Sequence, residues 1–234
     1  MRHEVSFTGI FSELASLLSA AWRETALFTL VIGGVGAVGL LTGIVEPPTE
    51  TFDFGFNFNT SENPLGSLFG LGLGIATFVA TYFLLKRYLS AQGRLRVGGG
   101  HFWPYFGMAL LSGIGIVVGL ILLIVPGLFL VVRWSAASGY LIGAGQGVTE
   151  SLGSSWDATS RHGWPIFFAI AALYVGTIAI AGVIGGVLGV ASLDAVIVIT
   201  PFIEAATNAL FSAFGIAVFC LVADDTEQLA ETFA

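Results

Sequence analysis

The chain contains few charged residues. Only 10% of its 234 residues are Asp, Glu, Lys or Arg, whereas soluble domains carry about 25%. Hydrophobic residues make up 56%, and the mean hydropathy is +0.92. A helix needs about 20 apolar residues to cross a bilayer, so most of the chain is expected to be surrounded by lipid. The uncharged runs long enough for a crossing are Thr25–Val45, Asn63–Leu85, Val97–Val132, Gly163–Leu193 and Ala205–Ala223.

Basic residues are scarcer than acidic ones, at 8 against 15, which gives a formal net charge of −7. Nucleic acid selects clustered Lys and Arg, so no nucleic-acid partner is expected. Cys220 is the single cysteine, which excludes an internal disulfide and a cysteine-based metal cluster. The three histidines lack ligand spacing, and no nucleophile–base set or phosphate loop is visible. We therefore predict no catalytic residue, no cofactor, no bound metal and no enzymatic activity.

Six membrane-spanning helices are predicted, near residues 25–45, 66–88, 104–124, 127–146, 165–190 and 196–222. The third and fourth are separated only by Ile124-Val125-Pro126-Gly127. Pro lacks an N–H and Gly accepts a turn, so we expect a tight hairpin there. The expected fold class is all-α, a polytopic six-helix transmembrane bundle. Its parts are a cytoplasmic interfacial amphipathic helix in 1–24, a six-span membrane domain in 25–223 and an acidic cytoplasmic tail in 224–234.

Seven of the eight basic residues fall on one side of the predicted membrane domain. They precede the first span or lie in the connections after the second and fourth spans: Arg2, Arg23, Lys86, Arg87, Arg94, Arg96 and Arg161. The opposite side receives acidic residues and neither Lys nor Arg. Because basic connections stay in the cytoplasm, both termini are expected there, in a bacterial inner membrane.

Residues 5–22 carry apolar residues at helical spacing, which predicts an amphipathic helix lying on the cytoplasmic leaflet. The pattern H-x-W-P-x-F then occurs twice, at His101–Phe106 and His162–Phe167. Each copy opens an odd-numbered span, where Pro suits the first helical turn and Trp suits the headgroup level. Trp22 occupies a comparable place before the first span. These features predict three parallel repeats, each an interfacial elbow helix followed by a helical hairpin, unless the two similar helix starts are a coincidence.

Arg133 and Glu204 are the charged residues predicted to lie inside spans. Both spans descend from the same side, and both residues are expected about 10 Å below it, at 1.5 Å per residue. Isolated charges at that depth are costly, and pairing is the usual remedy. An intramembrane ion pair is the favoured interpretation. A polar site on a transport route and an arginine that reaches the lipid headgroups are the alternatives.

Two further patterns concern packing and partners. Aromatic and polar residues alternate from Phe52 to Asn59, so a short extended segment would place Phe52, Phe54, Phe56 and Phe58 on one surface. That surface is either an interfacial aromatic belt or a docking surface for a partner. Glycines also recur four residues apart in several spans, including Gly39/Gly43, Gly70/Gly74, Gly115/Gly119 and Gly182/Gly186. Such spacing lets helices approach closely, within the chain or across a homodimer face.

The segment from Ile124 to Phe168 contains P-G-L-F-L-V-V-R-W-S and later E-S-L-G-S-S-W-D-A-T. This pattern resembles the membrane domain that precedes the catalytic barrel in some bacterial glycerophosphodiester phosphodiesterases, and related stand-alone membrane proteins. The motif positions are Pro126, Gly127, Trp134, Glu150, Ser155 and Trp156. The resemblance implies a cytoplasmic elbow helix within Gly147–His162, with Trp156 facing lipid and Glu150 and Asp157 facing water. Too few residues follow Val222 for a barrel, so the hydrolase activity is not expected here.

These observations favour a non-enzymatic inner-membrane protein that acts through assembly or membrane organisation. Its expected partners are membrane lipids and either a larger membrane complex, in which it is an accessory subunit, or further copies of itself. The alternative is a small transporter or channel with a polar pathway near Arg133 and Glu204. The scarcity of polar residues inside the spans favours the first interpretation, since translocation routes usually need more than two charges.

Overall fold

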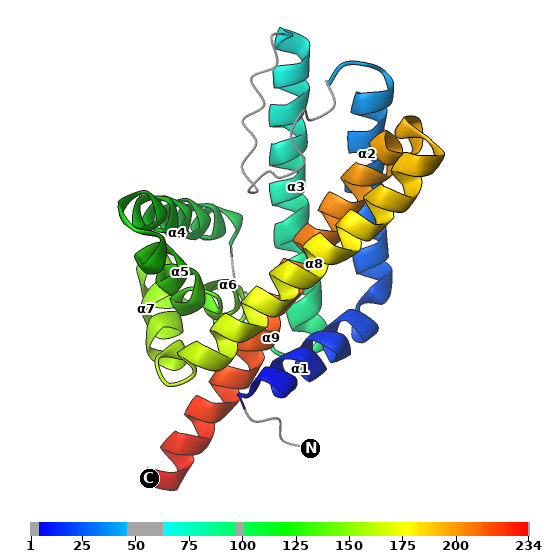
Figure 1. The fold of residues 1–234 in the computed structure, drawn as a ribbon. Helices are drawn as coiled ribbons and strands as arrows, with labels where there is room; N and C mark the ends of the chain where they lie inside the picture. The colour runs from blue at the N-terminus through cyan, green and yellow to red at the C-terminus, as the bar shows by residue number, and fades with distance from the viewer. Residues whose placement is uncertain (1–4, 46–62, 97–100, 234) are drawn as a thin grey trace. The chain divides into compact units, whose positions relative to one another are not determined.

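The computed structural model describes residues 5–45, 63–96 and 101–233 of the chain (Figure 1). All regular structure in these ranges is α-helical, which confirms the all-α prediction for this part of the chain. The helices are α1 Phe7–Ala20, α2 Trp22–Leu41, α3 Pro64–Ala91, α4 Phe102–Leu122, α5 Ile124–Arg133, α6 Ala137–Ile142, α7 Val148–Thr159, α8 Gly163–Ala191 and α9 Leu193–Phe233.

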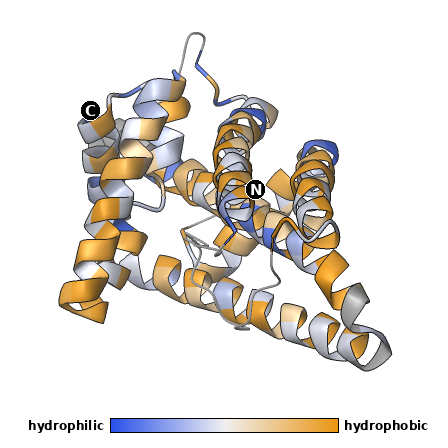
Figure 2. Cartoon of the chain, turned by 90° about the horizontal axis from the view of Figure 1, so that it is seen from above, coloured by the Kyte–Doolittle hydropathy of each residue, from blue (hydrophilic) through white to orange (hydrophobic). Residues whose placement is uncertain are grey.

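The six predicted spans are confirmed by length and composition. They run over Trp22–Leu41, Pro64–Ala91, Phe102–Leu122, Ile124–Ile142, Gly163–Gly189 and Ala195–Thr226. Figure 2 shows hydrophobic colour along most of these helices. In the most apolar stretch of α4 only 17% of residues are buried inside the protein. A surface this apolar requires lipid around it, so the chain has the make-up of a multi-pass membrane protein.

The chain folds into two compact units. The first comprises Met1–Trp22, Tyr82–Val175 and Phe211–Ala234, and the second comprises Arg23–Thr81 and Gly176–Leu210. One unit boundary falls at the start of α2, and the other three fall inside the long helices α3, α8 and α9. The first unit therefore holds α1, α4, α5, α6 and α7 whole, together with one end of each long helix.

The core of the first unit forms around the C-terminal half of α9. Ile216, Val218 and Val222 on this helix are fully buried. Gly139 on α6 allows a close crossing, because a Cβ at that position would overlap Phe219. The ring of Tyr140 meets the same Phe219 edge-on, with ring centroids 4.9 Å apart. Further fully buried side chains come from α1, α3, α6 and α8: Ile10, Leu17, Tyr88, Leu89, Leu141, Ile142 and Ile166.

Helix α1 confirms the helix predicted within residues 5–22, but much of its apolar face packs on protein. Ile10, Leu14 and Leu17 are at most 4% exposed, whereas Phe7 is 43% exposed. The face expected to lie in the lipid leaflet is therefore largely occupied by the protein's own core. Ser6 caps this helix by accepting a hydrogen bond from the N–H of Gly9 at 3.1 Å. The placement of α1 on the membrane surface stays a prediction.

The hairpin between the third and fourth spans turns at Leu123. This residue is extended, with φ −162° and ψ 138°, between the end of α4 and the start of α5. The expectation that Pro126 and Gly127 form the turn is therefore wrong. Both lie inside the first turns of α5, where the missing N–H of Pro has no intrahelical partner to lose. Gly127 instead lets the helices cross closely, because a Cβ on Gly119 would lie 3.0 Å from its Cα.

The two H-x-W-P-x-F segments begin their helices in the same way. Trp103 and Trp164 are each the second residue of a helix, and the following Pro is the third. Both tryptophans are largely exposed, at 75% and 72%. Helices α1 and α7 precede α2 and α8 in the chain, whereas residues 92–96 form no helix before α4. The three parallel repeats and their elbow helices stay a prediction.

The second unit packs α2 against α3 and α9 through glycines. A Cβ on Gly33 would lie 2.6 Å from the ring of Phe202, and one on Gly36 would lie 2.9 Å from Pro201. A Cβ on Gly39 would overlap the ring of Phe69 on α3. These contacts place a glycine face of α2 against α9 at the point where Pro201 interrupts its backbone hydrogen bonds.

Candidate functional site

Several residues of the family-like segment meet where α5 ends against α7. We call Phe129, Arg133, Ser155, Trp156 and Thr159 the Arg133 cluster. All five belong to the first unit, so their mutual geometry is defined there. Arg133 is the last residue of α5. The helix is interrupted by a turn at Trp134–Ala136 before α6 begins.

The backbone carbonyl of Arg133 is held by α7. The Ser155 hydroxyl donates to this oxygen at 2.7 Å. The Thr159 hydroxyl lies 3.2 Å from the same oxygen and also bonds the Ser155 carbonyl at 2.8 Å. The last carbonyls of a helix lack intrahelical partners, and buried hydroxyls require acceptors. Ser155 and Thr159, both fully buried, therefore find an acceptor for their hydroxyls and provide donors for the Arg133 carbonyl. These hydrogen bonds hold the end of α5 against α7.

The charged end of Arg133 lies among aromatic rings. Its guanidinium carbon is 4.7 Å from the centre of the Phe129 ring and 5.5 Å from that of Trp156. The two rings contact each other edge-on, with centroids 5.4 Å apart. Nε and Nη1 of Arg133 are buried and have no hydrogen-bond partner among the described residues. Cation–π contact thus supplies the observed stabilisation of this charge.

Other motif residues have packing or capping roles. The Trp134 ring fills the space beside Gly115 on α4, where a Cβ would lie 2.7 Å from its Cη2. The Glu150 carboxylate accepts a hydrogen bond from the N–H of Gly147 at 3.2 Å, at the start of α7. Trp156 is 37% exposed beside Phe129, so it retains an outward-facing edge, and Glu150 and Asp157 are also exposed.

Arg133 and Glu204 belong to different units, so the ion pair predicted between them stays a prediction. Within the second unit, Glu204 lies on α9 one helical turn before Asn208. The Thr81 hydroxyl of α3 donates to Oδ1 of Asn208 at 3.1 Å. Charge does not single out this neutral pair in the sequence, although the four-residue spacing of Glu204 and Asn208 is readable there.

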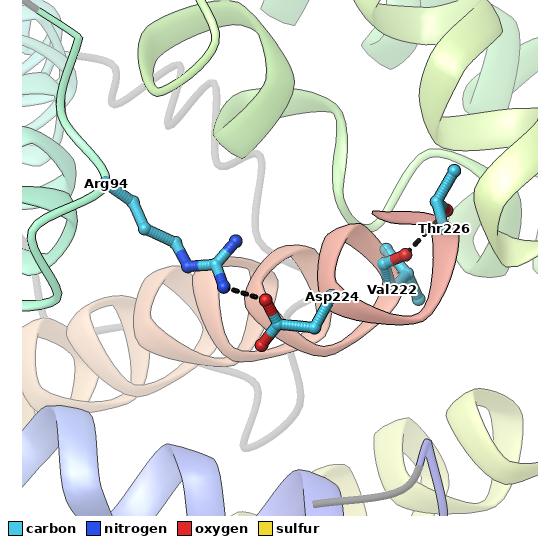
Figure 3. Close-up of polar contacts among 4 residues, drawn as sticks. All are labelled: Arg94, Val222, Asp224 and Thr226. Atoms are coloured by element: carbon cyan, nitrogen blue, oxygen red, sulfur yellow. Dashed lines mark hydrogen bonds and ion pairs between the residues drawn. The ribbon is translucent and has the colours of Figure 1, made fainter. Parts of the chain in front are cut away.

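A second set of charges joins distant segments of the first unit near the end of α9. Figure 3 shows Arg94, which follows α3, pairing with Asp224 on α9. Nε2 of His162 lies 3.8 Å from Oδ2 of Asp225. The acidic tail expected from residue 224 onward thus begins as a continuation of α9, and Thr226 bonds back to the Val222 carbonyl at 2.7 Å. Instead of being wholly solvated, its first two carboxylates contact basic groups from two connections.

Two other expectations concern metals and the phenylalanine segment. The described ranges contain no group of three or more His, Cys, Asp or Glu residues that could hold a metal ion. Phe52, Phe54, Phe56 and Phe58 lie outside the described residues, so the belt and docking alternatives for them both stay predictions.

Comparisons with protein-family models, with curated proteins and with solved structures found no match for this chain. Its class therefore follows from its own helices, six of which have the length and composition of membrane spans.

Proposed function

We propose that this chain is a non-enzymatic integral membrane protein that acts through assembly in the bilayer, as an accessory subunit of a complex or with further copies of itself. The observation that carries the proposal is a set of glycine faces that the described part of the chain leaves uncovered. At Gly70 and Gly74 on α3, and at Gly182 and Gly186 on α8, an added Cβ would meet no atom within 4 Å.

The glycines of α2 differ from those of α3 and α8 in having close neighbours within the protein. Gly33, Gly36 and Gly39 on α2 each have a neighbour that an added Cβ would overlap or press against. Glycine spaced four residues apart is destabilising in a helix unless a partner uses the close approach it allows. The glycines on α3 and α8 lie four residues apart and have no described partner, which supports a helix from another subunit as their occupant.

The proposed setting is a bacterial inner membrane with both termini in the cytoplasm. The basic residues of the connections support this orientation. Exposed Trp22, Trp103 and Trp164 at three helix starts are typical of a membrane–water interface and support lipid as a direct partner. The motif around Pro126, Arg133 and Trp156 supports kinship with the phosphodiesterase membrane domains.

The test measures association in native-like membranes. Gly70→Leu with Gly74→Leu would fill the uncovered face of α3, and Gly72→Leu provides a matched control on another side of the same helix, where a Cβ also meets no atom within 4 Å. We expect the double substitution to lower the associated fraction several-fold, measured by single-molecule photobleaching and by co-purification in mild detergent. The control should leave it unchanged. Equal association for all three chains would refute assembly through this face.

A second candidate function rests on the polar residues of the second unit. The Thr81–Asn208 hydrogen bond, one turn from Glu204, adds neutral polar groups to the charged ones inside the spans. A small transporter or channel would use such groups along its pathway. Flux of ions through vesicles containing the purified chain, abolished by Asn208→Leu, would favour this function over assembly.

A further inference from the structure

Arg133 carries a permanent charge at the end of a membrane-embedded helix. The arginine guanidinium stays protonated in proteins, so it cannot escape burial by losing its proton. Nε and Nη1 are buried donors without partners among the described residues, and Nη2 is not one of these covered atoms. A guanidinium with unsatisfied donors would be stabilised by an anionic hydrogen-bond acceptor.

The charge is held in place by its surroundings. The backbone of Arg133 is fixed by the Ser155 hydroxyl at 2.7 Å, and the guanidinium lies beside the contacting rings of Phe129 and Trp156. The side chain therefore presents its charge at a defined point beside two rings that are each partly exposed, at 45% and 37%. Because little side-chain freedom remains to be lost, a ligand would bind a largely preformed group.

Three carboxylates of the first unit are engaged away from Arg133. Asp224 pairs with Arg94, Asp225 lies beside His162, and Glu150 caps the start of α7. The surface that leads away from the cluster along the α4–α5 hairpin is apolar instead. Its exposed side chains include Val118, Ile121, Leu122, Val125 and Leu128.

We propose that the Arg133 cluster binds the phosphate group of an anionic phospholipid, with Arg133 as the anion-binding side chain and Phe129 and Trp156 as the flanking rings. Guanidinium suits phosphate because it offers several donors in one plane to an anion with several acceptor oxygens. The first phosphate oxygen would reach Nη2, and rotation of the partly exposed Trp156 ring would uncover the remaining donors. The acyl chains would lie on the apolar hairpin, which free phosphate has no means to use. This site is independent of the glycine faces on α3 and α8.

The experiment measures phospholipid retained by the purified full chain, using native mass spectrometry after exposure to phosphatidylglycerol or to phosphatidylcholine with the same acyl chains. We expect several-fold more phosphatidylglycerol on the unchanged protein. Arg133→Gln should abolish this preference, whereas Arg87→Gln, which removes an exposed charge from α3, should preserve it. Loss of the preference in both variants, or in neither, would overturn the proposal.

Two further arms keep the test decisive. Trp156→Leu and Phe129→Leu change partly exposed rings, so they should fold even if Arg133→Gln does not, and each should lower the preference. Inorganic phosphate at millimolar concentration should leave bound phosphatidylglycerol in place, and displacement would identify free phosphate as the ligand and overturn the lipid assignment. Glu204→Gln should leave retention unchanged, whereas an increase would mean that Glu204 had occupied Arg133 and that the lipid site does not exist in the native protein.

Discussion

The Ser155 hydroxyl donates to the backbone carbonyl of Arg133 at 2.7 Å, and so joins α7 to the end of α5 across 22 residues of sequence. The contact explains why a polar residue is fully buried in an otherwise apolar chain. It satisfies a carbonyl that the break at Trp134 leaves without an intrahelical donor. The Thr159 hydroxyl is a second donor to the same oxygen, at 3.2 Å.

We predict that Ser155→Ala and Thr159→Val each lower the free energy of unfolding by about 0.5–1.5 kcal/mol, the usual net value of one hydrogen bond. The double variant should lose more than the sum. After either single change the remaining hydroxyl still reaches the Arg133 carbonyl, whereas the double change leaves a buried acceptor unsatisfied. Reversible unfolding in mixed micelles measures both quantities. Ser112→Ala is the control, because that hydroxyl bonds only the Ala109 carbonyl of its own helix; strict additivity would contradict the shared acceptor.

Opposite signs are expected for alanine at two helical glycines. Gly139→Ala should destabilise the first unit by about 1–3 kcal/mol, as for other overpacked sites, because the new Cβ overlaps Phe219. Gly113→Ala on α4 should be neutral or stabilising by up to about 1 kcal/mol, because no atom lies within 4 Å of the new Cβ and alanine restricts the unfolded chain. The same unfolding assay compares them, and a destabilisation of equal size at both positions would argue against the α6–α9 crossing.

The sequence predicted those features that depend on composition over many residues. Long apolar runs predicted six spans, and the described residues contain six helices long and apolar enough to cross a bilayer. The position of the hairpin turn was harder, because Pro126 and Gly127 suit a turn and also suit the first turns of a helix. The turn lies at Leu123 instead. Gly127 lies within α5 and allows close packing against Gly119 in the facing helix.

The candidate site was predictable in its residues but not in its contacts. Arg133, Ser155 and Trp156 stood out through charge and motif spacing. Nothing local to Ser155 specifies an acceptor in another helix, and nothing local to Arg94 specifies Asp224, 130 residues later. Thr81 and Asn208 are uncharged, so charge alone does not predict the hydrogen bond between them. Tertiary pairing of this kind becomes visible only when the helices are placed.

The Arg94–Asp224 pair should show a small coupling that depends on salt. Its side chains are 27% and 47% exposed, so solvent screens the interaction, and about 0.2–1 kcal/mol is expected for such pairs. A double-mutant cycle with Arg94→Ala and Asp224→Ala measures the coupling, which should shrink at 1 M salt. Arg96 provides the control, because its guanidinium bonds the Ala144 carbonyl rather than a carboxylate. A cycle between Arg96→Ala and Asp224→Ala should give no coupling, and equal coupling in both cycles would contradict a specific pair.

The orientation of the spans can be measured with reporter fusions. We expect fusions at Thr51 and Ser192 to report the periplasm, and fusions at Arg94, Ser154 and Ala234 to report the cytoplasm, because basic residues lie on the latter side. Periplasmic activity at Arg94 would overturn the topology. Ser154, on α7, tests in addition whether the helix that holds the Arg133 carbonyl faces the cytoplasm.

The last prediction decides which anion accompanies Arg133. An intramembrane pair with Glu204, favoured by the sequence, implies that Arg133→Leu and Glu204→Leu each destabilise the protein by about 3–5 kcal/mol and that the double change costs less than either. A lipid phosphate at the Arg133 cluster implies instead that the two effects simply add. We expect additivity, because the guanidinium already packs against Phe129 and Trp156 and keeps donors without a hydrogen-bond partner among the described residues. Unfolding in micelles with and without phosphatidylglycerol measures both effects. The lipid should stabilise the unchanged protein and the Glu204 variant but not the Arg133 variant, since only a chain that binds the ligand gains from its presence. A double variant more stable than both single variants would restore Glu204 as the partner.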